Sequence, residues 1–307
     1  MSKVAVLFPG QGAQAVGMGK DLVEAFPETK TWFDRASEAL GFDLAQVCFE
    51  GPKEELMRSD RAQPAIFVHS VIAYELLKEK TGFTPSAGAG LSSGEWAALY
   101  AAGVVSFEDA IRILRVRGEA MQAACTEAES AMVSLIGLDD EAVKAVCEEA
   151  GVEVANYNSP GQTVVSGSKA ACETVPDIAK AKGARMAVPL PVAGAFHSTF
   201  MEPAKGVFAD FLNEIDFKEP SFPVYANVSG VAHEDAAAIK LAMPEQITSP
   251  VRWVENVEAM ARDGVEKAVE CGPGKVLCGL VKRIDKKLPT ANVADLASLE
   301  AASAFLA

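Results

Sequence analysis

The part of this sequence that most restricts its fold is a serine with a glycine two positions away on each side, Gly90-Leu91-Ser92-Ser93-Gly94. Small apolar residues precede it at 86–91, and the pattern at 95–102 predicts a helix. Glycines in these positions allow a sharp turn from a strand into a helix, although an ordinary turn rich in glycine and serine has the same composition. We expect an α/β domain with the Ser92 hydroxyl exposed at the turn, next to a helix N-terminus.

Further segments continue the α/β pattern on both sides of this turn. A wholly apolar run near the N-terminus stops at Pro9-Gly10, as is typical of a strand buried on both faces. Near the C-terminus a helix is expected to open after Gly272-Pro273-Gly274. The other predicted elements of this large unit are strands at 4–8, 223–227 and 267–270, and helices at 65–80 and 107–124.

The middle of the chain has a different order of elements. Strand and helix patterns alternate there as βαββαβ, which is the order of a ferredoxin-like unit. We therefore expect a small ferredoxin-like unit inserted into the larger α/β domain. Its predicted elements are strands at 131–138, 152–156, 162–166 and 185–190, and helices at 139–150 and 168–182.

The overall charge limits the partners that this chain can bind. Its formal net charge is −14, with 28 basic and 42 acidic residues. Nucleic acid and anionic membranes require a basic surface, so neither is expected as a partner.

The six cysteines show no regular spacing, and no apolar stretch is long enough for a signal peptide or a membrane span. We expect reduced thiols and a cytoplasmic protein.

A serine nucleophile needs a base, and the sequence has three histidines. His69 lies within an apolar helix pattern and is expected to be packed, whereas His233 lies in a polar loop and is expected to be solvated. His197 follows an irregular Gly-Ala-Phe segment and is the best candidate by elimination. Ser93 is a rival hydroxyl to Ser92, but its backbone N–H is better placed to bind an oxyanion than its side chain is to attack.

Several motifs in the same order resemble the malonyl-CoA:acyl carrier protein transacylases of bacterial fatty-acid synthesis, and they extend from about Val4 to Arg283. These motifs are Pro9-Gly10-Gln11-Gly12-Ala13-Gln14, Gly90–Gly94 with Glu95, Arg117, Asn156-Tyr157-Asn158-Ser159-Pro160-Gly161-Gln162, Ala195-Phe196-His197-Ser198, Pro250-Val251-Arg252-Trp253 and Glu270-Cys271-Gly272-Pro273-Gly274-Lys275. The resemblance implies an α/β-hydrolase-like large domain formed by 1–129 and 192–307, with a ferredoxin-like subdomain at 130–191.

The resemblance also implies roles for the catalytic residues. Ser92 would be the nucleophile and His197 its base, with no aspartate as a third member. The histidine would instead be oriented by a backbone carbonyl near a glutamine, which matches Gln246. The backbone N–H groups of Gln11 and Ser93 would form the oxyanion hole.

Three further residues would contact the substrate. Arg117 would bind the malonyl carboxylate, because a guanidinium matches a carboxylate through two parallel hydrogen bonds. From the residues alone, however, Arg117 is one of three arginines on a predicted helix, and such arginines are usually on the surface. Gln63 matches a glutamine that lines the pocket of the family, and Phe196 matches the malonyl-selecting form of its motif.

Three positions depart from the usual pattern of the family: Leu91, Ser93 and Ser249. Leu91 removes a polar neighbour of the nucleophile, and Ser249 weakens a side-chain role in orienting His197. Two alternatives share the same serine turn, namely a thioesterase or esterase and a trans-acting acyltransferase of polyketide synthesis. A catalytically idle docking module is a third, but such a module is expected to have lost Ser92 or His197.

The expected reaction needs malonyl-CoA and an acyl carrier protein, with no metal and no bound cofactor, and we expect a monomer. An acidic carrier can dock on so acidic a protein only at a local basic patch. The densest basic run surrounds the helix predicted after Gly274 and comprises Lys275, Lys282, Arg283, Lys286 and Lys287.

Overall fold

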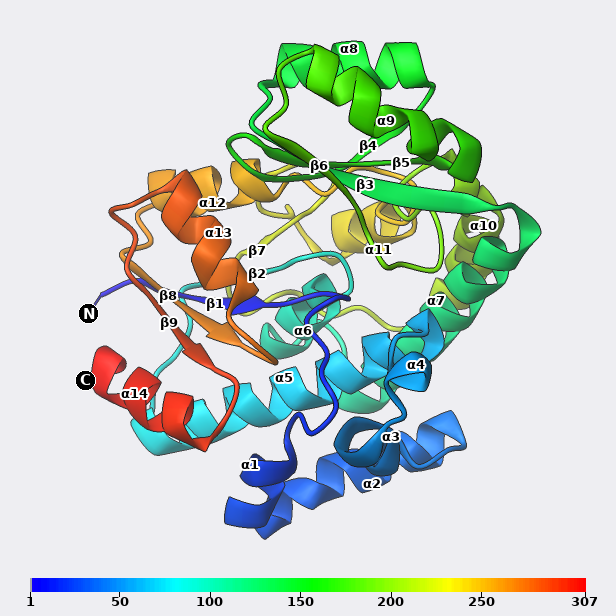
Figure 1. Cartoon of the computed structure of the whole chain (residues 1–307). Coiled ribbons are helices and arrows are strands. Elements are labelled where there is room, and N and C mark those ends of the chain that lie inside the picture. Colours follow the sequence, from blue (N-terminus) through cyan, green and yellow to red (C-terminus); the bar gives the residue numbers. More distant parts are fainter. Residues whose placement is uncertain (1) are drawn as a thin grey trace.

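The computed structural model describes residues 2–307 and contains two separate sheets (Figure 1). The larger sheet has five parallel strands in the order β7-β2-β1-β8-β9. Its strands are β1 (Val4–Phe8), β2 (Ala87–Gly90), β7 (Val224–Tyr225), β8 (Lys267–Cys271) and β9 (Thr290–Val293). Every residue of β1 is buried, as expected for the central strand of a parallel sheet.

Alternate residues of β1 face two different cores. Val4, Val6 and Phe8 belong to one core with apolar residues of α5 (Ser59–Thr81) and α7 (Phe107–Glu127). Ala5 and Leu7 belong to a second core with residues of α12 (Trp253–Arg262). This burial on both faces explains why the strand is apolar at every position. The remaining helices of the large unit are α1 (Lys20–Ala25), η1 (Pro27–Thr29), α2 (Lys30–Leu40), α3 (Leu44–Glu50), α4 (Lys53–Leu56), α6 (Gly94–Ala101), η2 (Thr199–Met201), α10 (Glu202–Leu212), α11 (Ala236–Glu245), α13 (Val276–Ile284) and α14 (Leu296–Leu306).

The smaller sheet has four antiparallel strands in the order β4-β5-β3-β6, and α8 and α9 cover one face of it (Figure 1). Apolar residues of the two helices and the sheet form a core of their own. Both the element order and the strand order are those of a ferredoxin-like unit. Its elements are β3 (Ser130–Ile136), α8 (Asp140–Ala150), β4 (Glu153–Ser159), β5 (Gln162–Ser168), α9 (Lys169–Ala181) and β6 (Met186–Pro189).

The predicted α/β fold with a ferredoxin-like unit is confirmed, and each predicted strand and helix overlaps one in the structure. The predicted helix at 65–80 begins six residues earlier, at Ser59. Several elements have no counterpart in the sequence prediction, among them α1 to α4 and α10 to α12. In the described residues, no helix has the length and apolar character that a membrane crossing requires.

Candidate active site

The serine turn connects β2 to α6 and lies against the end of β1. β2 ends at Gly90 and α6 begins at Gly94, so that Ser92 lies in the turn with a positive φ of 55°. A Cβ added to Gly94 would lie 2.2 Å from the carbonyl oxygen of Phe8, and one added to Gly90 would lie 2.0 Å from the Gly94 carbonyl. Only glycine fits these two positions, which is the physical reason for the pattern in the sequence.

Ser92 and His197 are hydrogen-bonded, with 2.8 Å between Oγ and Nε2. The Nδ1 atom of His197 lies 2.8 Å from the backbone oxygen of Gln246 and 3.2 Å from that of Ser249. A carbonyl oxygen only accepts hydrogen bonds, so Nδ1 carries the ring proton and Nε2 is free to accept one from the serine. Two backbone carbonyls therefore select the tautomer that a base requires.

Burial keeps the imidazole of His197 neutral. The residue is 4% exposed. Its desolvation, with the nearby Arg117 cation as a second cause, lowers the pKa of His197 to about 4. The ring is therefore unprotonated at neutral pH, as it must be to take a proton from Ser92.

Arg117 lies on α7 and is a buried residue of this site, not a surface arginine. It is 1% exposed, and its Nη2 is 3.3 Å from Ser92 Oγ and 3.0 Å from Gln246 Oε1. Its Nη1 donates to Gln63 Oε1 at 2.6 Å, while its buried Nε has no hydrogen-bond partner among residues 2–307. Burial lowers the pKa of Arg117 to about 10, so the guanidinium still carries its charge at pH 7.

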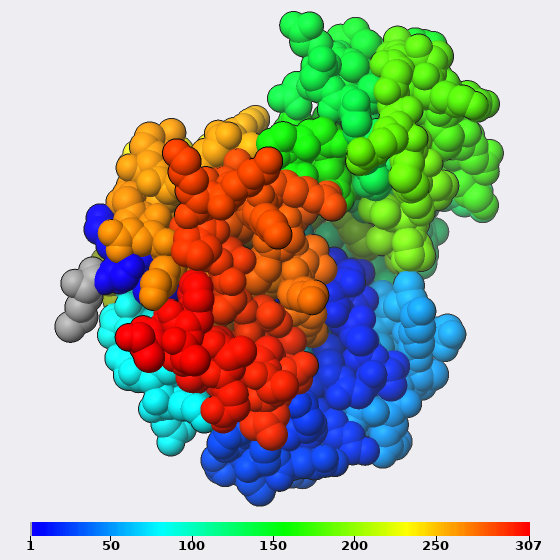
Figure 2. Space-filling model, turned by 60° about the vertical axis from the view of Figure 1, so that its left-hand side comes forward, coloured from blue at the N-terminus to red at the C-terminus, as the bar shows by residue number. Residues whose placement is uncertain are grey.

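A cavity of about 250 Å³ lies above these residues. Ser92, Arg117, His197 and Phe196 line it, together with apolar residues of both units. Gln63 does not line this cavity; it lies behind Arg117 and binds its guanidinium. In Figure 2 the green small subdomain projects beyond the rest of the molecule, and a recess separates it from the blue and orange segments.

The cavity wall also includes the turn that follows β1. A Cβ on Gly10 would lie 2.2 Å from the Leu91 carbonyl oxygen, so this turn rests directly against the serine turn. The Gln11 side chain donates to Ser59 Oγ at 3.2 Å, which anchors the turn to the start of α5. Within residues 2–307 the backbone N–H groups of Gln11 and Ser93 donate to no protein acceptor.

A buried polar network behind the nucleophile was missing from the sequence prediction. Asn227 Oδ1 accepts the Ser92 N–H at 2.6 Å, and Asn227 Nδ2 donates to the Gly90 oxygen at 2.7 Å. Glu95 belongs to this network and binds His233, with 2.8 Å between Oε1 and Nε2. The prediction that His233 is solvated is therefore wrong, because its side chain is only 3% exposed.

The other predicted residues are placed as follows. His69 is packed as predicted, with its Nε2 3.0 Å from the Ala294 oxygen. Asn156 and Asn158 line the cavity. Ser249 contributes through its backbone oxygen and not its side chain. No group of three or more histidine, cysteine or acidic side chains in the described chain is arranged to hold a metal ion.

Known proteins resemble this chain over nearly its whole length. The acyl transferase domain family matches residues 6–300. The malonyl CoA-acyl carrier protein transacylases of Bacillus subtilis and Escherichia coli K12 are 44% and 42% identical to it. Both comparisons cover 98% of this chain, and they cover 96% and 99% of the relatives.

Solved structures agree at the level of the fold. An acyl carrier protein S-malonyltransferase from Vibrio cholerae is 45% identical, with a TM-score of 0.93 over 98% of this chain and 100% of that one. A malonyl-transacylase in complex with a type II PKS acyl-carrier protein is 44% identical, with a TM-score of 0.96 over 99% of this chain and 100% of the other.

The fold, the paired serine and histidine and the family match together define an acyltransferase enzyme. The full-length relatives narrow this class further. The chain belongs to the malonyl CoA-acyl carrier protein transacylase family.

Proposed function

We propose that this protein transfers the malonyl group of malonyl-CoA to the phosphopantetheine thiol of an acyl carrier protein. The observation that carries the proposal is the Arg117 guanidinium, which lies 3.3 Å from the hydroxyl oxygen of Ser92 in a buried cavity. A cation beside the nucleophile suits an acyl group that ends in a carboxylate. The relatives are named for malonyl-CoA and acyl carrier protein, and this supports the same substrates here.

Ser92 and His197 carry out the first half of the reaction. His197 Nε2 takes the hydroxyl proton while Ser92 Oγ attacks the thioester carbonyl carbon and a C–O bond forms. The tetrahedral intermediate then collapses and the C–S bond breaks. The imidazolium gives its proton to the leaving thiolate, so that coenzyme A departs as a thiol and malonyl remains as an ester of Ser92.

The second half reverses these steps with a different thiol. The phosphopantetheine thiol gives its proton to His197 and attacks the malonyl ester. The C–O bond to Ser92 breaks, and Oγ recovers its proton from the imidazolium. Two half-reactions through one acyl-enzyme give ping-pong kinetics.

The remaining residues stabilise charge or select the substrate. The free N–H groups of Gln11 and Ser93 bind the oxyanion, and one such donor is worth roughly 3–4 kcal/mol in the transition state. Arg117 binds the malonyl carboxylate, Gln63 supports Arg117 from behind, and Phe196 narrows the acyl end of the cavity.

The two units divide this work. Residues 1–129 and 192–307 form the catalytic domain and supply the nucleophile, the base and Arg117. The subdomain at 130–191 covers the cavity with residues such as Met132 and Asn156. A cytoplasmic location and a monomeric state remain predictions.

A serine hydrolase is less well supported by the same site. In the described part of the chain, the Nδ1 atom of His197 contacts two backbone carbonyls and no carboxylate. A buried arginine in the acyl pocket also has no use in hydrolysis of a neutral ester. A polyketide acyltransferase would use the same chemistry with a different carrier.

Mass spectrometry of the intact protein tests the proposal. Malonyl-CoA should add one malonyl group to the protein, and peptide mapping should place it on Ser92. Ser92→Ala should form no adduct, whereas the matched variant Ser93→Ala should still form it. Transfer to fatty-acid and polyketide carriers in parallel assays then identifies the carrier. An adduct on a cysteine, or hydrolysis faster than transfer, would contradict the proposal.

A further inference from the structure

Glu95 is a buried carboxylate to which the mechanism above assigns no role. It lies in the first turn of α6 and its side chain is 1% exposed. Oε1 accepts a hydrogen bond from His233 Nε2 at 2.8 Å, and Oε2 accepts one from Gln246 Nε2 at 2.6 Å and one from the Asn227 N–H at 3.1 Å. A charge removed from water is tolerated only with such partners, so the carboxylate is held in one position.

The side chain of Gln246 lies between this carboxylate and the buried arginine. Its Nε2 donates to Glu95, and its Oε1 accepts from Arg117 Nη2 at 3.0 Å. A carboxylate can only accept hydrogen bonds and a guanidinium can only donate them. The amide therefore fits in one orientation, with its nitrogen toward Glu95 and its oxygen toward Arg117.

The backbone of the same glutamine orients the base. The carbonyl oxygen of Gln246 accepts from His197 Nδ1 at 2.8 Å. The side-chain Nε2 of Gln246 also donates to the Ser92 carbonyl oxygen at 3.1 Å. Gln246 is 1% exposed, at the C-terminal end of α11. A residue whose side chain is clamped at both ends has little freedom to move its carbonyl away from the histidine.

Because Gln246 lies between Glu95 and Arg117, the guanidinium of Arg117 stays available to bind the substrate. All hydrogen bonds of the Arg117 guanidinium inside the described chain go to neutral oxygens, those of Gln63, Ser92 and Gln246. The charge of Glu95 opposes the effect of burial on the pKa of Arg117. A direct salt bridge would occupy the face of the guanidinium that the malonyl carboxylate needs.

We infer that Glu95 is a positioning residue which, through Gln246, holds the substrate-binding arginine and the catalytic histidine in place. Its carboxylate sets the orientation of the Gln246 amide, and His233 holds the far side of the carboxylate. Glu95 touches neither the reacting atoms nor His197, so it is not the acid of a catalytic triad. The inference rests on the proposed function.

Two substitutions separate the reach of the side chain from its charge. Glu95→Asp keeps the charge but is one methylene too short for Gln246. Glu95→Gln removes the charge but keeps an oxygen that can accept from Gln246. The new amide nitrogen can donate to His233 when the imidazole adopts its other tautomer. Positioning predicts that Asp lowers kcat with malonyl-CoA by roughly 10- to 100-fold and that Gln recovers most of this loss. Higher activity for Asp than for Gln would overturn the inference.

The choice of acyl group distinguishes positioning from simple loss of folded protein. A smaller folded fraction lowers kcat equally for malonyl and acetyl and leaves KM unchanged. Loss of the hydrogen bond between Glu95 and Gln246 should instead raise KM for malonyl-CoA and lower the ratio of malonyl to acetyl transfer rates, because Arg117 loses a partner. Glu270→Asp is the matched control: Glu270 is also a fully buried carboxylate, but it binds the N–H groups of Leu277 and Cys278. It should lower Tm without changing the ratio.

A double-mutant cycle gives the final test. If Glu95 acts through Gln246, the variant carrying both Glu95→Asp and Gln246→Ala should be no less active than the poorer single variant. Multiplied losses would overturn the inference. The malonyl adduct of the unchanged protein is measured in the same series. Failure of that adduct would contradict the proposed function, whereas a normal adduct with unaltered Glu95→Asp kinetics would contradict the positioning role alone.

Discussion

Ser92 and His197 are hydrogen-bonded to each other, and both have left-handed backbone conformations, with φ of 55° and 58°. Among residues 2–307 they are the only residues other than glycine with positive φ. Such conformations are strained for residues with a Cβ and persist where the surrounding structure holds them. Two separate turns, 105 residues apart in the chain, are therefore both held in unfavourable geometry at the point where their side chains meet.

The environment of His197 predicts an unusually acidic limit for activity. Since burial and Arg117 lower the pKa of His197 to about 4, the base stays neutral as the pH falls below 6.5. The kcat/KM for malonyl-CoA should therefore fall only as the pH drops through about 4. Arg117→Ala removes the second cause and should move this limit to higher pH in acetyl transfer. A limit near 6.5 in the unchanged protein would contradict the prediction.

Replacement of Arg117 by alanine should change the choice of substrate. Truncating one partner of a buried charged pair costs about 2–5 kcal/mol, which lowers malonyl transfer by roughly 30- to 5000-fold. Transfer of uncharged acetyl should hold steady or rise. Steady-state kinetics with both thioesters measure this. Arg112→Ala, at a 43% exposed arginine of the same helix, is the matched control and should change neither rate more than about twofold. Equal losses for both substrates would make Arg117 structural.

The close contact at the serine turn predicts a large effect of one methyl group. Gly94→Ala would place a Cβ 2.2 Å from the Phe8 oxygen, in a part of the backbone that cannot move without displacing β1. We expect a loss of roughly 3 kcal/mol or more in the free energy of unfolding. Gly206→Ala is the control, because Gly206 lies inside α10 and, beyond the backbone of that helix, no atom of the described residues lies within 4 Å of the added Cβ. It should stabilise the protein by about 0.5–1 kcal/mol. Urea denaturation measures both values, and similar effects of the two substitutions would contradict the packing argument.

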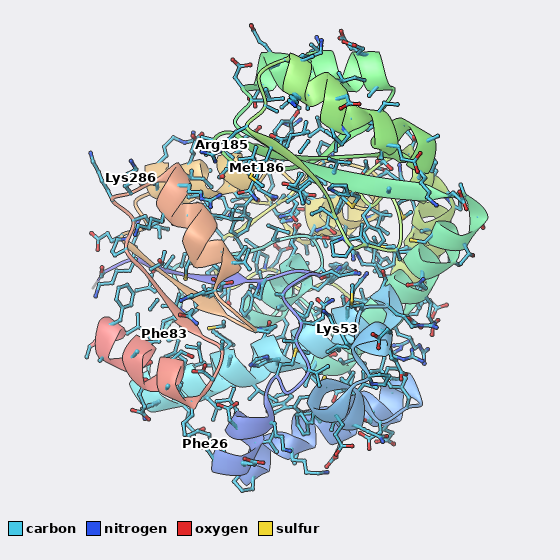
Figure 3. The ribbon with its side chains drawn as sticks, in the orientation of Figure 1. Phe26, Lys53, Phe83, Arg185, Met186 and Lys286 are labelled. Carbon is cyan, nitrogen blue, oxygen red and sulfur yellow. The ribbon has the colours of Figure 1, made fainter. Side chains whose placement is uncertain are left out.

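The basic residues around α13 predict where the acidic carrier docks. Lys282, Lys286 and Arg185 are exposed, and α13 packs against β4 of the small subdomain. Figure 3 shows Arg185 and Lys286 in the part of the molecule where α13 and the small subdomain face each other. Arg283 donates to Gln162, which lines the cavity, so reversing its charge would also disturb the site.

Lys282→Glu with Lys286→Glu should raise the KM for carrier protein and weaken its dependence on salt, with little change in the KM for malonyl-CoA. Lys20→Glu is the control, because Lys20 is exposed at the start of α1, at the end of the molecule away from the small subdomain (Figure 1). An unchanged carrier KM at low salt would exclude this surface as the docking site.

Local patterns in the sequence were sufficient for eight of the nine strands in the two sheets, whereas β9 (Thr290–Val293) at the edge of the larger sheet was not predicted. The run at 4–8 is apolar because both of its faces are buried, and Gly90 and Gly94 are required by contacts shorter than a Cβ allows. The short helices between Lys20 and Leu56 were not predicted. Apart from α2, each has at most seven residues, too few for periodicity to give a clear signal, and α2 to α4 pack against α5. The apolar stripe of α2 at Phe33, Ala36 and Leu40 is a signal from which that helix could have been predicted.

The nucleophile, its family and the order of its motifs could be inferred from the residues. A serine turn with its flanking strand and helix is specified by neighbouring residues, and the family motifs can be matched along the chain. The surroundings of that serine could not. His233 was expected to be solvated and is buried against Glu95, and Gln63 was expected to line the cavity and instead supports Arg117. These contacts join residues that are 54 to 138 positions apart in the chain. Burial and hydrogen-bond partners at such separations arise only when the chain has folded, because they depend on which helices meet behind the sheet.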